Sequence, residues 1–121
     1  MKKLLFSLSI LGALFTAINS FVFAANFYWV GGTGNWSDYS NHWATTSGGA
    51  SFHSNAPTAS DDVFFDASSG GGTVSLDTDG TCASITISSG QTLAVVSNTF
   101  SVTGNATIAG TISLSTGTID V

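Results

Sequence analysis

Three aspartates, Asp61, Asp62 and Asp66, surround the short apolar segment Val63–Phe65 and are the first candidates for acid–base or metal chemistry. In an extended strand Asp62 and Asp66 fall on one face, and a rise of about 3.3 Å per residue separates them by roughly 13 Å. The two carboxyl groups of a glycosidase are closer, at roughly 5 to 10 Å. The spacing therefore indicates separate carboxylates that are solvated, cap turns or bind calcium one at a time with loop carbonyls.

A second acidic segment, Asp77-Thr-Asp79-Gly80, resembles the first half of a calcium-binding loop. Such loops place oxygen ligands at alternate positions and close on a bidentate glutamate. That glutamate does not follow here. Asp77 and Asp79 are therefore candidate Ca²⁺ ligands, with turn capping as the alternative, and we expect no other cofactor.

The two histidines, His42 and His53, do not form a recognisable metal or catalytic motif. They lie 11 residues apart, with no cysteine or paired carboxylate at the spacing of a zinc site. No Gly-x-Ser-x-Gly segment is present, and serine and aspartate are too common in the predicted loops to indicate a catalytic triad. The sequence thus predicts a protein that is not an enzyme.

Residues 1–24 have the layout of a secretory signal peptide. Lys2 and Lys3 precede an apolar run from Leu4 to Ile18, and a small-x-small sequence ends at Ala24. We expect cleavage after Ala24 and a protein that is secreted or held at the cell surface of a bacterium. The alternative is that the same apolar run remains as an uncleaved membrane anchor.

Cleavage would leave residues 25–121 without lysine or arginine but with all seven acidic residues. Without cations the chain has nothing to neutralise phosphates, so binding to nucleic acid or to an anionic membrane surface is disfavoured. A single cysteine, Cys82, rules out a disulfide framework. We interpret Cys82 as a small apolar residue, with a free thiol that pairs between chains as the alternative.

Short segments of alternating polar and apolar residues fill the second half of the chain. This period of two is typical of half-buried β-strands, and glycine and asparagine turns separate the segments. The predicted strands are Val74–Leu76, Ile85–Ile87, Leu93–Val95, Phe100–Val102, Ala106–Ile108, Ile112–Leu114 and Ile119–Val121.

Apolar positions of these strands recur at a common spacing of about 20 residues. The recurring pairs are Ile87 with Ile108, Leu93 with Ile112, Phe100 with Ile119 and Val74 with Leu93. Three short strands per repeat predict an all-β fold, a three-sided parallel β-solenoid of about three coils over residues 61–121. An antiparallel sandwich is the alternative.

Residues 25–60 contain all three tryptophans, and we expect them to form an N-terminal cap and loop. Trp29, Trp36 and Trp43 recur every seven residues beside glycine and asparagine turns. The first coil of a solenoid has an unpaired edge and an open apolar interior, which must be covered. Three clustered indoles are suited to that cover.

The segments YWVGGTGNWSD, NHW and NAPTASDDVFFDASSGGGTVSL resemble the start of many secreted bacterial and phage-associated β-solenoid proteins. In that family W-x-G-G-x-G-x-W, (N/H)-W and P-T-x-x-D-x-V-x-F-D segments precede Ser/Thr-rich repeats of adhesin-like or tail-fibre-like proteins. The resemblance covers Phe27 to about Leu76 and implies no catalytic set. It implies cap and first-coil roles for Trp29, Gly31, Gly32, Gly34, Trp36, Trp43, Pro57, Asp61, Asp62, Val63, Phe65 and Asp66.

These features favour a non-catalytic structural or adhesive module, with Tyr28 and Tyr39 as candidate glycan contacts. The alternative is the N-terminal fragment of a parallel β-helix polysaccharide lyase or hydrolase. Ice binding is a third hypothesis, but a threonine ladder that begins at Thr86 and Ser88 breaks at Ala109.

The C-terminal segment Thr118–Val121 alternates like a strand but is followed by no turn or polar cap. Terminal repeats of stacked proteins normally carry such a cap. We expect the natural protein either to continue past Val121 or to self-associate, as a dimer or a fibre, through this edge.

Overall fold

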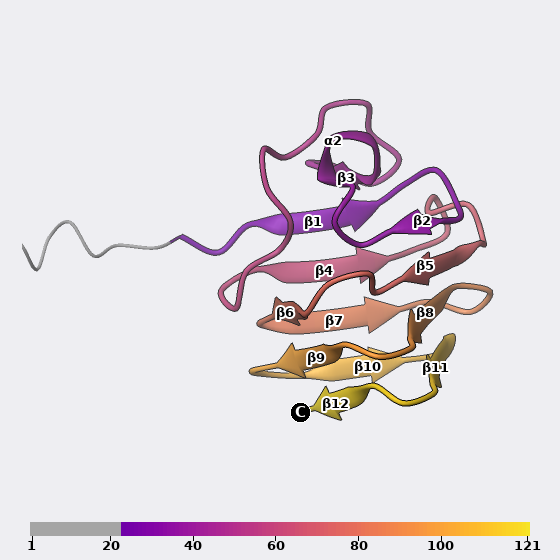
Figure 1. Cartoon of the computed structure of the whole chain (residues 1–121). Helices are drawn as coiled ribbons and strands as arrows, with labels where there is room; N and C mark the ends of the chain where they lie inside the picture. Colours follow the sequence, from indigo (N-terminus) through magenta and orange to yellow (C-terminus); the bar gives the residue numbers. More distant parts are fainter. Residues whose placement is uncertain (1–22) are drawn as a thin grey trace, which may run out of the picture.

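A computed structural model describes residues 23–121, and Figure 1 shows their arrangement. They form twelve β-strands and one four-residue helix, α2 (Tyr39–His42). The expected signal peptide and its helix lie, except for Phe23 and Ala24, outside the described residues. In the described part, no helix is long and apolar enough to cross a membrane.

The strands form three sheets, each with its own order of neighbouring strands. The first sheet is β10 (Ala106–Ile108), β7 (Ser84–Ile87), β4 (Asp62–Phe65), β1 (Asn26–Trp29) and β3 (Trp43–Ala44). The second sheet is β11 (Thr111–Leu114), β8 (Thr92–Val95), β5 (Thr73–Ser75) and β2 (Gly34–Asn35). The third sheet is β12 (Thr118–Asp120), β9 (Thr99–Val102) and β6 (Gly80–Cys82).

From β4 onward, the chain visits the three sheets in the same order three times, and each visit to all three makes one round. The rounds are β4 to β6, β7 to β9, and β10 to β12, and they are stacked in Figure 1. All neighbouring strands are parallel except β1 and β3. The antiparallel sandwich alternative is therefore wrong.

The register of the sheets follows the spacing of the apolar residues in the sequence. The pairs expected from that spacing face each other across neighbouring strands, and they are Ile87 with Ile108, Leu93 with Ile112, Phe100 with Ile119 and Val74 with Leu93. In β7, β8 and β9 the apolar side chains at these positions point inward, because these three strands alternate buried and partly exposed residues.

The corners between the first and second sheets depend on glycine. Gly32, Gly70, Gly71 and Gly90 have positive φ angles of 71°, 98°, 71° and 86°, which side chains other than that of glycine rarely adopt. Successive corners also approach closely, because the N–H of Gly32 donates to the carbonyl of Ser69 at 2.8 Å. A Cβ atom on Gly70 would lie 2.8 Å from the nitrogen of Gly32.

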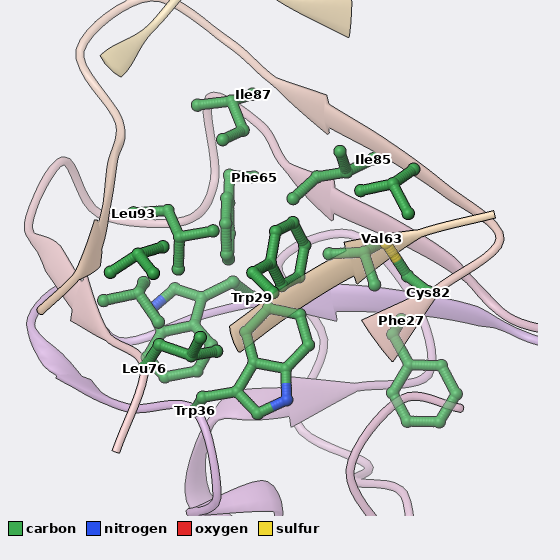
Figure 2. Close-up of a cluster of buried hydrophobic side chains, with 14 of the residues drawn as sticks. Phe27, Trp29, Trp36, Val63, Phe65, Leu76, Cys82, Ile85, Ile87 and Leu93 are labelled. Atoms are coloured by element: carbon green, nitrogen blue, oxygen red, sulfur yellow. The ribbon is translucent and has the colours of Figure 1, made fainter. Parts of the chain in front are cut away.

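Large apolar side chains fill the space between the sheets, as Figure 2 shows. Gly80, which we expected in a turn, instead begins β6 and is buried. A Cβ atom there would lie 2.6 Å from Leu76 Cδ1 and 3.2 Å from both the Phe100 and Trp36 rings. The missing side chain therefore makes room for two aromatic rings, and Gly80 is a packing position rather than a turn.

Cys82 lies in the core with its side chain fully buried. Burial, with the negative charge of Asp62 as the second cause, raises the pKa of the Cys82 thiol to about 12. This environment favours the small apolar interpretation of Cys82 over a thiol that pairs between chains.

The thiol predicts a stability loss in alkali. Above pH 9 the unfolded chain loses the Cys82 proton while the folded chain keeps it, so stability should fall between pH 9 and 12, by at most about 1.4 kcal/mol per pH unit. Urea unfolding across this range should show the loss, and Cys82→Ala should reduce it. An unchanged pH dependence in Cys82→Ala would contradict the prediction.

Candidate functional site

The three indoles come together at the N-terminal end of the stack and are all buried. Trp43 stands edge-on to both Trp29 and Trp36, with ring centroids 5.0 Å and 4.9 Å apart. Two of the indole nitrogens are satisfied locally, since Trp43 Nε1 donates to the Trp36 carbonyl at 2.8 Å and Trp29 Nε1 donates to the Gly32 carbonyl at 2.7 Å. The cluster is thus packed as a core rather than presented as a surface.

His42 lies beside this cluster in a slot that the nearby glycines leave open. Its ring is parallel to that of Trp29, with centroids 4.4 Å apart, and Nδ1 lies 2.6 Å from the Val30 carbonyl. A Cβ atom on Gly34 would lie 2.5 Å from His42 Nε2, and one on Gly31 would lie 3.0 Å from Nδ1. Because they have no Cβ atom, Gly31 and Gly34 leave space for the His42 ring. The sequence analysis did not predict this contact.

The slot predicts that Gly34→Ala lowers the free energy of unfolding by about 1 to 3 kcal/mol, because the new methyl group overpacks against a fixed ring. The matched test repeats Gly34→Ala in a His42→Ala background, where the methyl group has space and should cost less than about 1 kcal/mol. Equal costs in both backgrounds, measured by urea unfolding, would contradict the slot.

The aspartates around β4 serve different local structures and do not converge on one point. Asp61 is 5% exposed and accepts hydrogen bonds from the backbone nitrogens of Ala25 and Thr58. Asp62 faces outward and accepts from the Ser84 hydroxyl at 2.6 Å. Asp66 accepts from the Ser47 hydroxyl at 2.6 Å and so ties the loop after β3 to the first round.

Asp77 and Asp79, the candidate calcium ligands, both accept hydrogen bonds from protein groups. Asp77 accepts from the backbone nitrogen of Ser37 at 3.0 Å and from the Ser37 hydroxyl. Asp79 accepts from the backbone nitrogen of Thr99 at 2.8 Å. Across residues 23–121, no group of three or more His, Cys, Asp or Glu side chains is placed to hold a metal ion. The observed bonds tie this loop to Ser37 and Thr99, which are distant in sequence, and they are neither a calcium site nor caps of the local turn.

The bonds to Ser37 also affect the pKa of Asp77. Burial acts to raise this pKa, but the hydrogen bonds from the Ser37 side chain and backbone lower it below its ordinary value. The stability that these bonds contribute is present above the unfolded-state pKa of about 3.8 and is lost as the pH falls through the lowered value.

The outer face of the first sheet carries an aromatic row. Tyr28 is paired with Phe64 across β1 and β4, and their rings are stacked with centroids 4.9 Å apart. On one side the paired positions continue through Ala44, which is fully buried, to Phe52, which is 38% exposed. On the other side Thr86 follows Phe64, and all these residues share one face because paired residues do so.

A polar row runs beside the aromatic row on the same face. Asn26, Asp62 and Ser84 are paired across β1, β4 and β7. They stand two residues before Tyr28, Phe64 and Thr86, which is roughly 7 Å along a strand. The face therefore offers flat rings next to a carboxylate, which accepts hydrogen bonds, and next to an amide and a hydroxyl, which both donate and accept them.

Of the two tyrosines that the sequence singled out, only Tyr28 belongs to this face. Tyr39 begins α2 and is 38% exposed. Among the described residues, no ring contact joins Tyr39 to Tyr28. Sequence reasoning missed Phe64 and Phe52, although the likeness of Asn26-Phe-Tyr-Trp29 to Asp62-Val-Phe-Phe65 was a signal for the first.

Comparisons with known proteins add no relative: no family model matches the chain, and neither the curated proteins nor the solved structures contain a match.

Proposed function

We propose that this chain is a non-catalytic structural and adhesive module of the secreted or cell-surface kind, which contacts neutral glycans through the outer face of the first sheet. The observation that carries the proposal is the stacked pair of Tyr28 and Phe64 on an outward face. We further propose that the module is a short parallel β-solenoid with an aromatic cap, of the adhesin-like or tail-fibre-like kind that the sequence resembles.

The support for a solenoid is the regular order of the strands. Each of three rounds places one strand in each of three parallel sheets. Partners in neighbouring rounds lie 19 to 22 residues apart, as in Thr73 with Thr92 and Asp62 with Ser84. The support for a cap is the buried cluster of Trp29, Trp36 and Trp43 on the first round.

The support for a glycan ligand is the chemistry of the outer face. The flat apolar side of a pyranose ring packs well on an aromatic ring, and its hydroxyl groups can bond to the row of Asn26, Asp62 and Ser84. Residues 25–121 contain no lysine or arginine, so the face offers no cation to an acidic sugar. Neutral polysaccharides therefore fit better than uronic acid polymers.

The proposal predicts retention on insoluble chitin or cellulose, with little retention on polygalacturonate as the acidic comparison. Tyr28→Ala should lower retention on the neutral polymer at least fivefold, because the stacked platform is halved. Tyr39→Ala is the matched control, since this tyrosine lies outside the aromatic row, and it should bind like the unchanged chain. Binding isotherms, calculated from the protein that remains in the supernatant after incubation with the polymer, compare the unchanged chain with the two variants.

Two results would overturn the proposal. Absence of retention on every neutral polymer, or equal retention of the Tyr28→Ala variant, would contradict a glycan-contacting face. Release of reducing ends or unsaturated sugars from the polymers would favour the polysaccharide lyase or hydrolase alternative instead.

A further inference from the structure

The buried carboxylate of Asp61 binds the backbone nitrogen at which the expected signal-peptide cleavage would create a new terminus. Asp61 Oδ1 accepts a hydrogen bond from Ala25 N at 3.0 Å. Asp61 Oδ2 accepts from the nitrogen and the hydroxyl of Thr58, each at 2.8 Å. With 5% exposure, this carboxylate has little contact with water and faces only neutral donors among these partners.

Ala25 is also held by contacts of its side chain and its carbonyl. Its side chain packs against the hydrophobic core, and its carbonyl accepts a hydrogen bond from Asp62 N at 2.9 Å. The two described residues before it, Phe23 and Ala24, are exposed, Phe23 by 81%. The peptide bond between Ala24 and Ala25 therefore joins an exposed residue to one that hydrogen bonds and core contacts hold in place.

We infer that hydrolysis of the Ala24–Ala25 bond seats a free α-ammonium group on Asp61, so that processing strengthens the attachment of β1 to the first round. The inference rests on the export that the proposed function includes. A signal endopeptidase adds water across this amide, so that Ala24 leaves with a carboxylate. The nitrogen of Ala25 becomes an amine, which takes up a proton at neutral pH.

The charge balance of the chain makes this pairing distinctive. Residues 25–121 contain no lysine or arginine, so the new ammonium group is the one cation there besides the histidines. An ammonium group donates three hydrogen bonds where the amide donates one, and hydrogen bonds between charged partners are the stronger kind. A buried carboxylate gains most from such a partner, because it is poorly solvated.

The same composition provides a selective test. In the processed chain the α-amino group is the only amine, so an acetylating reagent neutralises that charge alone and leaves an N–H that can still bond to Asp61. The full chain is exported with its own leader from a bacterial host, and its new N-terminus is identified by mass spectrometry. Acetylation of the purified product should then raise the unfolding equilibrium constant in urea about tenfold or more at pH 7.

Two variants locate the effect. Asp61→Asn should make the protein insensitive to acetylation, because no carboxylate remains to pair with the ammonium group. Asp77→Asn is the matched control: Asp77 also accepts a backbone nitrogen and a hydroxyl from one residue, Ser37, but does not bind Ala25. This variant should stay as sensitive to acetylation as the unchanged chain.

The outcomes separate this inference from the glycan proposal. A processed chain that begins at any residue other than Ala25, or acetylation without effect on unfolding, would overturn the ion pair whether or not glycans bind. Should Asp61→Asn fail to fold, the acetylation result on the unchanged sequence still decides. Loss of glycan binding alone, with acetylation still destabilising, leaves the ion pair in place and rejects only the adhesive function.

Discussion

Trp36→Ala is expected to lower the free energy of unfolding by about 3 to 5 kcal/mol, the range for removing a buried large aromatic side chain. Trp36 is 1% exposed and touches Trp43 and Phe100 edge-on, with ring centroids 4.9 Å and 5.3 Å away. The indole also lies against Gly80, beside Leu76 and Phe100, so its loss leaves a cavity among these side chains. Urea unfolding followed by circular dichroism measures the difference.

Thr86→Ala is the matched control for Trp36→Ala. Thr86 faces outward from β7, and its replacement should change stability by no more than about 0.5 kcal/mol. Equal effects of the two substitutions would reject the tryptophan cluster as a structural cap, and would favour the rings as an exposed glycan platform.

The spacing of apolar residues predicted the second half of the fold well, because each round repeats the same inward positions. The register pairs such as Leu93 with Ile112 and Phe100 with Ile119 follow from the sequence alone. β6 escaped prediction, since its inward residue is Gly80 and a glycine has no side chain to show the alternation. The rings of Trp36 and Phe100, which are distant from Gly80 in sequence, lie next to the position that a Gly80 side chain would take.

The candidate site was less predictable than the fold. The alternation around β4 placed Asp61 and Asp62 on opposite faces of the strand, and the structure buries Asp61 with Val63 while Asp62 and Phe64 stay partly exposed. The stacking of Phe64 on Tyr28 and the seating of His42 between Trp29 and Gly34 depend on contacts between separate segments. No local pattern in the chain encodes such contacts.

The open end of the stack is expected to make this polypeptide self-associate as a dimer at micromolar concentrations. β10, β11 and β12 pair with the preceding round on one side only. Apolar side chains stay exposed there, with Ile108 at 41%, Leu114 at 53% and Val121 at 72%. Unpaired strand edges beside apolar side chains are sites of association.

The opposite end limits the form of this association. There β3 pairs with the outer edge of β1, and α2 and the loop that follows lie beyond it, as Figure 1 shows, which blocks head-to-tail stacking at the first sheet. The remaining contact is between the open ends of two copies. Because this contact joins identical surfaces, it is complete in a dimer and does not grow into a fibre. If this polypeptide associates through its C-terminal edge, the blocked first sheet favours a dimer over a fibre.

Sedimentation velocity of residues 25–121 tests the dimer. Leu114→Lys should shift the equilibrium toward monomer at least tenfold, because it places a charge among the exposed apolar side chains of the open end. Ser113→Lys, one residue earlier on the same strand but on its outward face, is the control and should shift the equilibrium far less. A clean monomer at high micromolar concentration would contradict association through this end. A ladder of larger species would show that the aromatic cap does not block the other end.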